Sequence, residues 1–297
     1  MSSDLSAERD RYVRLIGDSQ AAKRLIVAGP GTGKTHVFRK ALSACNGRGL
    51  ALTFINNLAA DLADALRELA DASTFHAFCR GKLHKLGAAG LTSSFTYFPA
   101  FRLIVDADLS LLWGKSSNSD LYIQNLDDST GIISSVMDIG SYYDAVGHSD
   151  AVYRCLVHYG EHPESVPAYP LVVVDEYQDF TLLEVSLLDQ LATNSPTLIA
   201  GDDDQALYAF RGSSPAFIRK LAGDSDWARF DLPFCSRSTE VVVGAVNDLV
   251  AAAQERGLLV GRIAKPYSCY HPDKAHDSAR YPTTVHAACS VERQTAP

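Results

Sequence analysis

The chain has 297 residues, of which 46% are hydrophobic and 21% charged, and its formal net charge is -8. This composition is ordinary for a globular protein and excludes a disordered tail, a collagen-like fibre and a coiled-coil rod. The excess of acidic groups also excludes an extended basic coat, so any surface that binds nucleic acid has to be a local patch.

Cysteine usage and hydropathy bear on the compartment. The six cysteines are scattered and form no Cys-x-x-Cys pair, which is typical of free thiols in a cytosolic protein. The longest apolar runs are far shorter than the ~20 residues that a membrane-spanning helix needs. We therefore expect a cytoplasmic protein with no membrane partner.

Four short apolar runs predict strands, at residues 25–28, 50–54, 171–174 and 197–200. Continuous apolar runs of this kind suit strands of a parallel sheet that is buried on both faces. Helical patterns follow the first three runs, at residues 35–44, 58–69 and 182–191. The alternation predicts an α/β fold, with a parallel sheet flanked by helices.

Between about residues 80 and 170 the pattern changes to an aromatic-rich stretch, with helical periodicity over 101–113 and 131–143. From Arg102 to Pro170 about 10 side chains are acidic and 3 basic, which accounts for nearly the whole excess negative charge. We expect a mostly helical insertion over 81–169, within an α/β domain formed by residues 1–80 and 170–260.

The chain after residue 238 is expected to hold one long helix and then an irregular tail. The helix is predicted over 239–256, with Ser238 as its cap and Gly257 as its stop. The tail, residues 261–297, contains several prolines and has one candidate strand near 283–288.

A glycine-rich turn joins the first predicted strand to the first predicted helix, which is the context that a phosphate-binding loop requires. In such a loop the backbone N–H groups face the phosphates, and the helix N-terminus adds a favourable dipole. Lys34 would reach the β- and γ-phosphates, and the Thr35 hydroxyl would bind Mg²⁺. The alternative is an ordinary strand-to-helix turn. The predicted loop comprises Ala28, Gly29, Pro30, Gly31, Thr32, Gly33, Lys34 and Thr35.

Acidic and amide side chains follow the third and fourth predicted strands, at the edge where α/β sheets place ligands. Asp175 can hold Mg²⁺ and Glu176 can polarise an attacking water as general base. After the fourth strand come three adjacent aspartates and Gln205, which could sense the γ-phosphate. Solvated acidic turns are the alternative for both segments.

Taken in chain order, these motifs resemble those of the UvrD/Rep/PcrA-type helicases of superfamily 1. The specific signals are Asp-Glu-Tyr-Gln-Asp at 175–179, Gly-Asp-Asp-Asp-Gln at 201–205 and Phe-Arg-Gly at 210–212. Segments 53–60, 74–79 and 232–238 resemble further motifs of that family. The resemblance covers roughly residues 5 to 250. It implies a RecA-like P-loop NTPase core that is interrupted by a helical subdomain.

The resemblance also implies a DNA-dependent ATPase with ATP and Mg²⁺ as cofactors and single-stranded DNA as partner. Thr35 and Asp175 would bind the metal, while the catalytic side chains would be Lys34, Glu176, Gln205 and Arg237. The path of the DNA would include an aromatic ring on which a base can stack. Core packing is the alternative for Phe75 and Phe210. The implied DNA contacts are Thr53, Asn56, Thr74, Phe75, His76, Tyr208, Phe210 and Arg211.

The sequence also departs from the family pattern. Nothing after residue 260 resembles the later motifs, so 261–297 is expected to be the start of a second motor domain that the chain does not complete. Arg9 stands where the family usually has a glutamine that reads adenine. The insertion is acidic, although a DNA-binding surface should be basic. One basic cluster, which would either bind phosphates or form a solvated helix face, consists of Arg80, Lys82, His84 and Lys85.

Two functions other than an autonomous ATPase stay open. The chain could be an ATP- and DNA-binding switch without turnover, or half of a split helicase whose second motor domain is on another chain. Glu176 favours hydrolysis, because a module that only binds has no need of a general base. We expect weak, salt-sensitive DNA binding and no unaided unwinding.

Overall fold

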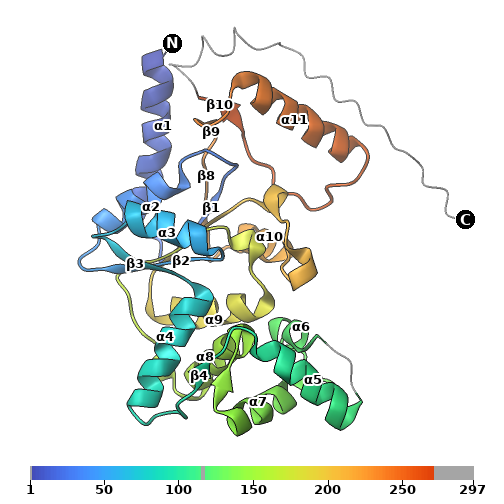
Figure 1. The fold of residues 1–297 in the computed structure, drawn as a ribbon. Helices are drawn as coiled ribbons and strands as arrows, with labels where there is room; N and C mark the ends of the chain where they lie inside the picture. Colours follow the sequence, from blue (N-terminus) through green and yellow to red (C-terminus); the bar gives the residue numbers. More distant parts are fainter. Residues whose placement is uncertain (1, 115–117, 271–297) are drawn as a thin grey trace, which may run out of the picture.

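The computed structural model describes residues 2–114 and 118–270, and a parallel sheet of six strands forms its centre (Figure 1). The strand order is β3-β2-β6-β7-β1-β8. After β1 the chain forms β2 and β3 at the far edge of the sheet. It then returns through β6 to β7, which pairs with β1, and ends the sheet with β8 on the other side of β1. The strands are β1 (Lys23–Val27), β2 (Gly49–Thr53), β3 (Ala70–Thr74), β6 (Val172–Val174), β7 (Thr197–Gly201) and β8 (Ala228–Asp231).

The four predicted strands are confirmed as β1, β2, β6 and β7, which form the interior of the sheet. The two strands that the sequence did not predict, β3 and β8, form its edges. Their sequences are Ala-Asp-Ala-Ser-Thr and Ala-Arg-Phe-Asp, and both have exposed or half-buried positions. An edge strand has one neighbour and an accessible side, so it carries no continuous apolar run.

Each face of the sheet has its own apolar core, because successive side chains of a strand point to opposite faces. On β1, Ile26 belongs to one cluster while Leu25 and Val27 belong to the other. The first cluster is covered by α1 (Ser2–Gly17), α2 (Lys34–Ser43) and α3 (Asn56–Ala65). The second is covered by α9 (Leu182–Asn194) and α10 (Ala216–Ala222).

The expected insertion is helical, and in Figure 1 its helices lie at the end of the molecule opposite to α1. The predicted helices over 101–113 and 131–143 correspond to α5 and α7. The expected boundary at residue 81 falls inside a helix, α4, which begins at Phe75 and carries the chain out of the sheet. The elements are α4 (Phe75–Ala88), β4 (Thr96–Tyr97), α5 (Phe101–Trp113), α6 (Ser119–Gln124), α7 (Ile132–Tyr143), β5 (Ala145–Val146) and α8 (His148–Glu161).

A small β-α-β unit follows the six-stranded sheet. Strands β9 (Phe234–Cys235) and β10 (Ser268–Cys269) pair in parallel on either side of α11 (Glu240–Glu255). The N-cap of α11 is Thr239 and not the predicted Ser238, while Gly257 with φ 69° follows the helix as predicted. The candidate strand near 283–288 lies outside the described residues. Within the described ranges, no helix has both the length and the hydropathy that a membrane crossing requires.

Candidate nucleotide and nucleic-acid sites

A hydrogen bond within the loop and close packing against the segment after β9 fix the glycine-rich turn between β1 and α2. Within the loop, the Thr32 hydroxyl donates to the carbonyl oxygen of Gly29 at 2.8 Å. Gly31 has φ 70°, and a Cβ at this position would lie 2.4 Å from Cβ of Arg237. Only glycine therefore fits both the left-handed backbone and the close approach of the segment after β9.

One pocket of about 370 Å³ brings the predicted nucleotide residues together. It is formed by the loop, by helix α3, by the ends of β6 and β7 and by the segment after β9. Ala28 and Gly29 are the two predicted loop residues that do not line it. Every predicted catalytic and metal-binding side chain does, namely Lys34, Thr35, Asp175, Glu176, Gln205 and Arg237.

The two carboxylates after β6 differ in their surroundings. Burial raises the pKa of Asp175 to about 6, although the nearby Lys34 ammonium opposes the rise. Glu176 has a left-handed backbone, with φ 54°, which is uncommon for a non-glycine residue and typical of functional sites. Its side chain lies 3.7 Å from Nζ of Lys34 and accepts a hydrogen bond from Nε2 of Gln178 at 2.8 Å. The hydroxyl of Thr35 and the carboxylate of Asp175 are oxygen donors, the type that Mg²⁺ prefers.

Gln178 links the two acidic segments, a role that the sequence did not indicate beyond its place in a family motif. Its side chain is buried in the turn that follows β6. Its Nε2 donates to Glu176, and its Oε1 accepts from the backbone N–H of Asp202 at 3.0 Å. Asp202 in turn accepts a hydrogen bond from Nε2 of Gln205 at 2.6 Å. The predicted base and the predicted γ-phosphate sensor therefore belong to one hydrogen-bonded chain.

A second pocket of about 520 Å³ lies between the sheet and the helical insertion. The insertion contributes side chains that include Tyr97, Arg102 and His148. Five of the eight predicted DNA contacts line this pocket, namely Asn56, Thr74, His76, Phe210 and Arg211.

The other three predicted contacts do not line the pocket. Thr53 is fully buried, and Phe75 is buried in the core, where it packs edge-on against Phe180 with ring centroids 5.0 Å apart. Both side chains face the protein interior and not the pocket, and their place on the DNA path stays a prediction. Tyr208 is half-buried between the rings of Phe54 and Phe210.

The second pocket is a local basic patch on an acidic chain. Three arginines, Arg80, Arg102 and Arg211, line it together with a single carboxylate, Asp120. Of the basic cluster in α4, Arg80 alone lines the pocket, and its guanidinium lies over the ring of Tyr97 at 4.7 Å. Arg80 comes from the cluster for which phosphate binding was one of two alternatives, whereas Phe54 and Tyr97 are lining residues outside the predicted DNA contacts. Phe54 lies inside the family motif at 53–60, which is the sequence signal that points to it.

Two histidines, His76 and His148, line this pocket and are kept neutral. Burial, with smaller contributions from His148 and Arg211, lowers the pKa of His76 to about 3. The pKa of His148 is also lowered, mainly by burial, and its ring lies edge-on to that of His76 at 5.3 Å. The positive charge of the pocket near neutral pH is therefore that of its arginines.

Comparison with known proteins gives two kinds of match. The sequence profile of a family described as an AAA domain matches residues 14–211. The ATP-dependent DNA helicase UvrD1 of Mycobacterium leprae is 26% identical over 336 aligned residues, which cover 86% of this chain and 42% of that protein. UvrD1 of Mycobacterium tuberculosis is 27% identical over 329 residues, covering 86% and 41%. The ATP-dependent DNA helicase UvrD2 of the same species is 36% identical over 92 residues, covering 30% and 13%.

Proposed function

We propose a function for this chain from the family it belongs to: it is a member of the AAA domain family and a motor domain of the UvrD-type superfamily 1 helicases. In our proposal it binds ATP with Mg²⁺ and hydrolyses the γ-phosphate, and single-stranded DNA in the second pocket stimulates the turnover. The chain spans 42% of the length of the M. leprae relative, so duplex unwinding is not part of the proposal.

The convergence of five chain segments on one pocket is the observation that carries the ATPase proposal. The loop from Pro30 to Thr35 supplies backbone N–H groups and the Lys34 ammonium for the phosphates. Thr35 and Asp175 would hold Mg²⁺, which supplies positive charge to the phosphates when bound. Gln205 and Arg237, which line the same pocket, would contact the γ-phosphate.

Glu176 is the general base in this proposal. Its position is fixed by the hydrogen bond from Gln178 and by the ion pair with Lys34. When Lys34 turns to a phosphate, it releases Glu176 to accept the proton of the attacking water. Glu176 therefore stays paired with Lys34 until a phosphate group binds the Lys34 ammonium.

The loop after β7 connects the proposed ATPase to the second pocket. Gln205 lines the nucleotide pocket, while Phe210 and Arg211 in the same loop line the basic pocket. Phe210 is 74% exposed, so its ring is free to stack on a base, and the arginines can bind the phosphates of a single strand. We propose that this loop is the physical link between DNA binding and hydrolysis.

Equilibrium ATP binding and phosphate release, measured on the wild-type chain and on Glu176→Gln, test the ATPase proposal. We expect binding in both proteins and turnover in the wild type, reduced by about 10²- to 10⁴-fold in the variant because the general base is lost. Binding without turnover in the wild type would support the switch that the sequence left open. Absence of binding would contradict the whole assignment.

A further inference from the structure

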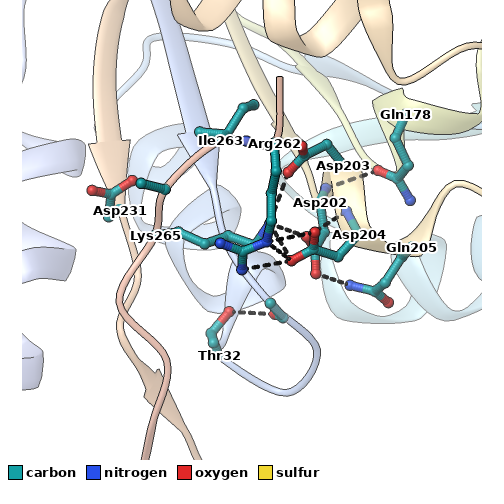
Figure 2. Close-up of polar contacts among 12 residues, drawn as sticks. Thr32, Gln178, Asp202, Asp203, Asp204, Gln205, Asp231, Arg262, Ile263 and Lys265 are labelled. Carbon is teal, nitrogen blue, oxygen red and sulfur yellow. Dashed lines mark hydrogen bonds and ion pairs between the residues drawn. The ribbon is translucent and has the colours of Figure 1, made fainter. Parts of the chain in front are cut away.

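The three aspartates after β7 hold an ammonium group between them. Nζ of Lys265 lies 2.6 Å from Asp202 and 2.8 Å from each of Asp203 and Asp204 (Figure 2). One oxygen from each of the three carboxylates lies within 4.8 Å of the other two, a spacing that would also suit a metal ion. Because the lysine occupies this position, the cluster is an ion-pair site and not a metal site.

Lys265 belongs to the connecting segment between α11 and β10, residues 256–267, about 60 residues after the aspartates. A second cation from the same segment, Arg262, pairs with Asp204 at 2.8 Å. The third cation, Arg219 of α10, pairs with Asp203 at 3.0 Å and donates to the carbonyl oxygen of Val260 in the connecting segment at 3.1 Å. Three cations therefore balance three carboxylates.

This charge balance matters because Lys265, Asp202 and Asp203 are buried, while Asp204 lies at the exposed side of the cluster. The side chains of Lys265, Asp202 and Asp203 are 4%, 3% and 0% exposed. Burial by itself would raise the pKa of Asp203, but the hydrogen bonds from Lys265, Ile263 and Arg219 outweigh it and lower the pKa. Removing one partner of such a cluster leaves an uncompensated buried charge, which is strongly unfavourable.

Asp202 connects the cluster to the nucleotide pocket in two directions. Its carboxylate accepts a hydrogen bond from Nε2 of Gln205 at 2.6 Å. Its backbone N–H donates to Oε1 of Gln178, whose Nε2 donates to Glu176 at 2.8 Å. Lys265 is therefore connected to Gln205 through Asp202. It is connected to Glu176 through Asp202 and then Gln178.

We propose that Lys265, supported by Arg262, is a positioning residue that fixes Gln205 and Glu176 for the γ-phosphate by neutralising the aspartate cluster. The inference rests on the proposed function, because it assigns the cluster to the same nucleotide pocket. Without the Lys265 ammonium, two arginines remain to balance three carboxylates. The repulsion between the carboxylates then displaces Asp202, and with it Gln205 and Gln178, which are hydrogen-bonded to Asp202. The phosphate loop meets these residues through the ion pair of Lys34 with Glu176, but its backbone N–H groups donate no hydrogen bond to Asp202, Gln178 or Gln205, so we expect its binding of the α- and β-phosphates to change little.

A comparison of two nucleotides separates this role from a general structural one. The affinities of ADP and of a non-hydrolysable ATP analogue, each with Mg²⁺, are measured by calorimetry on the wild type and on Lys265→Met. We expect the ADP affinity to stay within about twofold. The affinity for the ATP analogue should fall about tenfold, the loss of one hydrogen bond to a charged group.

Arg229→Met is the matched control. Nη2 of Arg229 donates to the carbonyl oxygen of Ala264 at 2.6 Å, so it holds the same connecting segment one residue before Lys265. It pairs with Asp231 and makes no contact with the aspartate cluster. We therefore expect Arg229→Met to bind both nucleotides as the wild type does. An equal loss of γ-phosphate discrimination in this control would overturn the inference, because it would show that anchoring the segment is sufficient.

Arg262→Met keeps the inference testable if Lys265→Met does not fold. Arg262 pairs with Asp204 alone among the three aspartates and is 11% exposed, so its loss should reduce discrimination in the same direction but by less. Unchanged discrimination in every variant that folds would overturn the role of the cluster while leaving the proposed function intact. A wild type that binds neither nucleotide would instead contradict the proposed function, and the inference with it.

Discussion

Nζ of Lys34 lies 3.7 Å from Oε1 of Glu176, so the phosphate-binding lysine and the proposed general base form an ion pair across the nucleotide pocket. Both side chains are largely buried, at 10% and 21% exposed. Within this distance the carboxylate competes directly with a phosphate for the ammonium. The pair therefore links the occupancy of the phosphate loop to the availability of the base.

A first prediction concerns the competition in this pair. Glu176→Gln removes the negative charge and should leave ATP affinity equal or higher, because Lys34 no longer has to break an ion pair before it binds a phosphate. Turnover should fall at the same time, so affinity and rate move in opposite directions. Glu240→Gln, at the exposed start of α11, is the control and should change neither. A fall of affinity in Glu176→Gln would argue against the competition.

A second prediction concerns the backbone of the phosphate loop. Gly31→Ala places a Cβ at φ 70° and 2.4 Å from Cβ of Arg237, so we expect lower thermal stability and loss of ADP binding. Gly81→Ala is the matched control, since Gly81 lies inside α4 with no atom within 4 Å of the added Cβ. It should be stabilised by about 0.5–1 kcal/mol, the usual helix preference of alanine over glycine.

A third prediction concerns the exposed ring of the second pocket. Phe210→Ala should weaken binding of a single-stranded oligonucleotide by about 1–3 kcal/mol, the usual value of one base–aromatic stack. Its effect on stability should be small, because the ring is 74% exposed. Leu207→Ala offers a control in the same loop that is 77% exposed and does not line the pocket. Similar losses in both variants would show that the loop, and not the ring, binds DNA.

A fourth prediction concerns salt. If Arg80, Arg102 and Arg211 each neutralise one phosphate of a single strand, the log of the binding constant should fall with log salt at a slope of about −2. Replacing Arg80 by methionine should make this slope shallower by about 0.7. Fluorescence anisotropy across a salt series measures both values. A slope near zero would exclude backbone contacts in this pocket.

A fifth prediction follows from Asp175, whose pKa burial raises to about 6 from the ordinary 3.8. A carboxyl with a raised folded-state pKa destabilises the fold as pH rises from about 4 to 6, because the folded protein holds the proton more tightly than the unfolded chain. Asp175→Asn should therefore raise the melting temperature at pH 7 more than at pH 5.

The same group should control metal binding. Because Mg²⁺ requires the ionised carboxylate, the Mg²⁺-dependent part of ATP affinity should weaken below about pH 6 in the wild type. In Asp175→Asn this pH dependence should be absent. A wild-type profile that is flat between pH 5 and 7 would contradict a role of Asp175 as metal ligand.

The interior strands and the nucleotide pocket could be predicted because they depend on local patterns. Buried strands such as β6 are continuous apolar runs, and parallel strands end at one edge of a sheet, so the polar residues after them meet there. The edge strands β3 and β8 have no such pattern, and the position of α4 across the expected domain boundary depends on its packing against α8. Thr53 and Phe75 lie in a motif, but motif membership does not tell which side chains turn inward.

The contacts of Lys265 illustrate what a sequence does not reveal. The residue lies in a segment with no helical or alternating period, and about 60 positions separate it from the aspartates that it binds. Three adjacent aspartates indicate that cations must be nearby, since buried carboxylates are paired. The tertiary structure decides which cations these are, because the segment that returns from α11 to β10 brings Arg262 and Lys265 to the aspartates.

Steady-state phosphate release with and without single-stranded DNA tests the central claim most directly, because it requires both pockets and the loop between them. We predict turnover that rises when the DNA is added, with the rise reduced in Phe210→Ala and basal turnover unchanged. Turnover that is insensitive to DNA, or equally stimulated in Phe210→Ala and wild type, would contradict the proposed coupling between the two pockets.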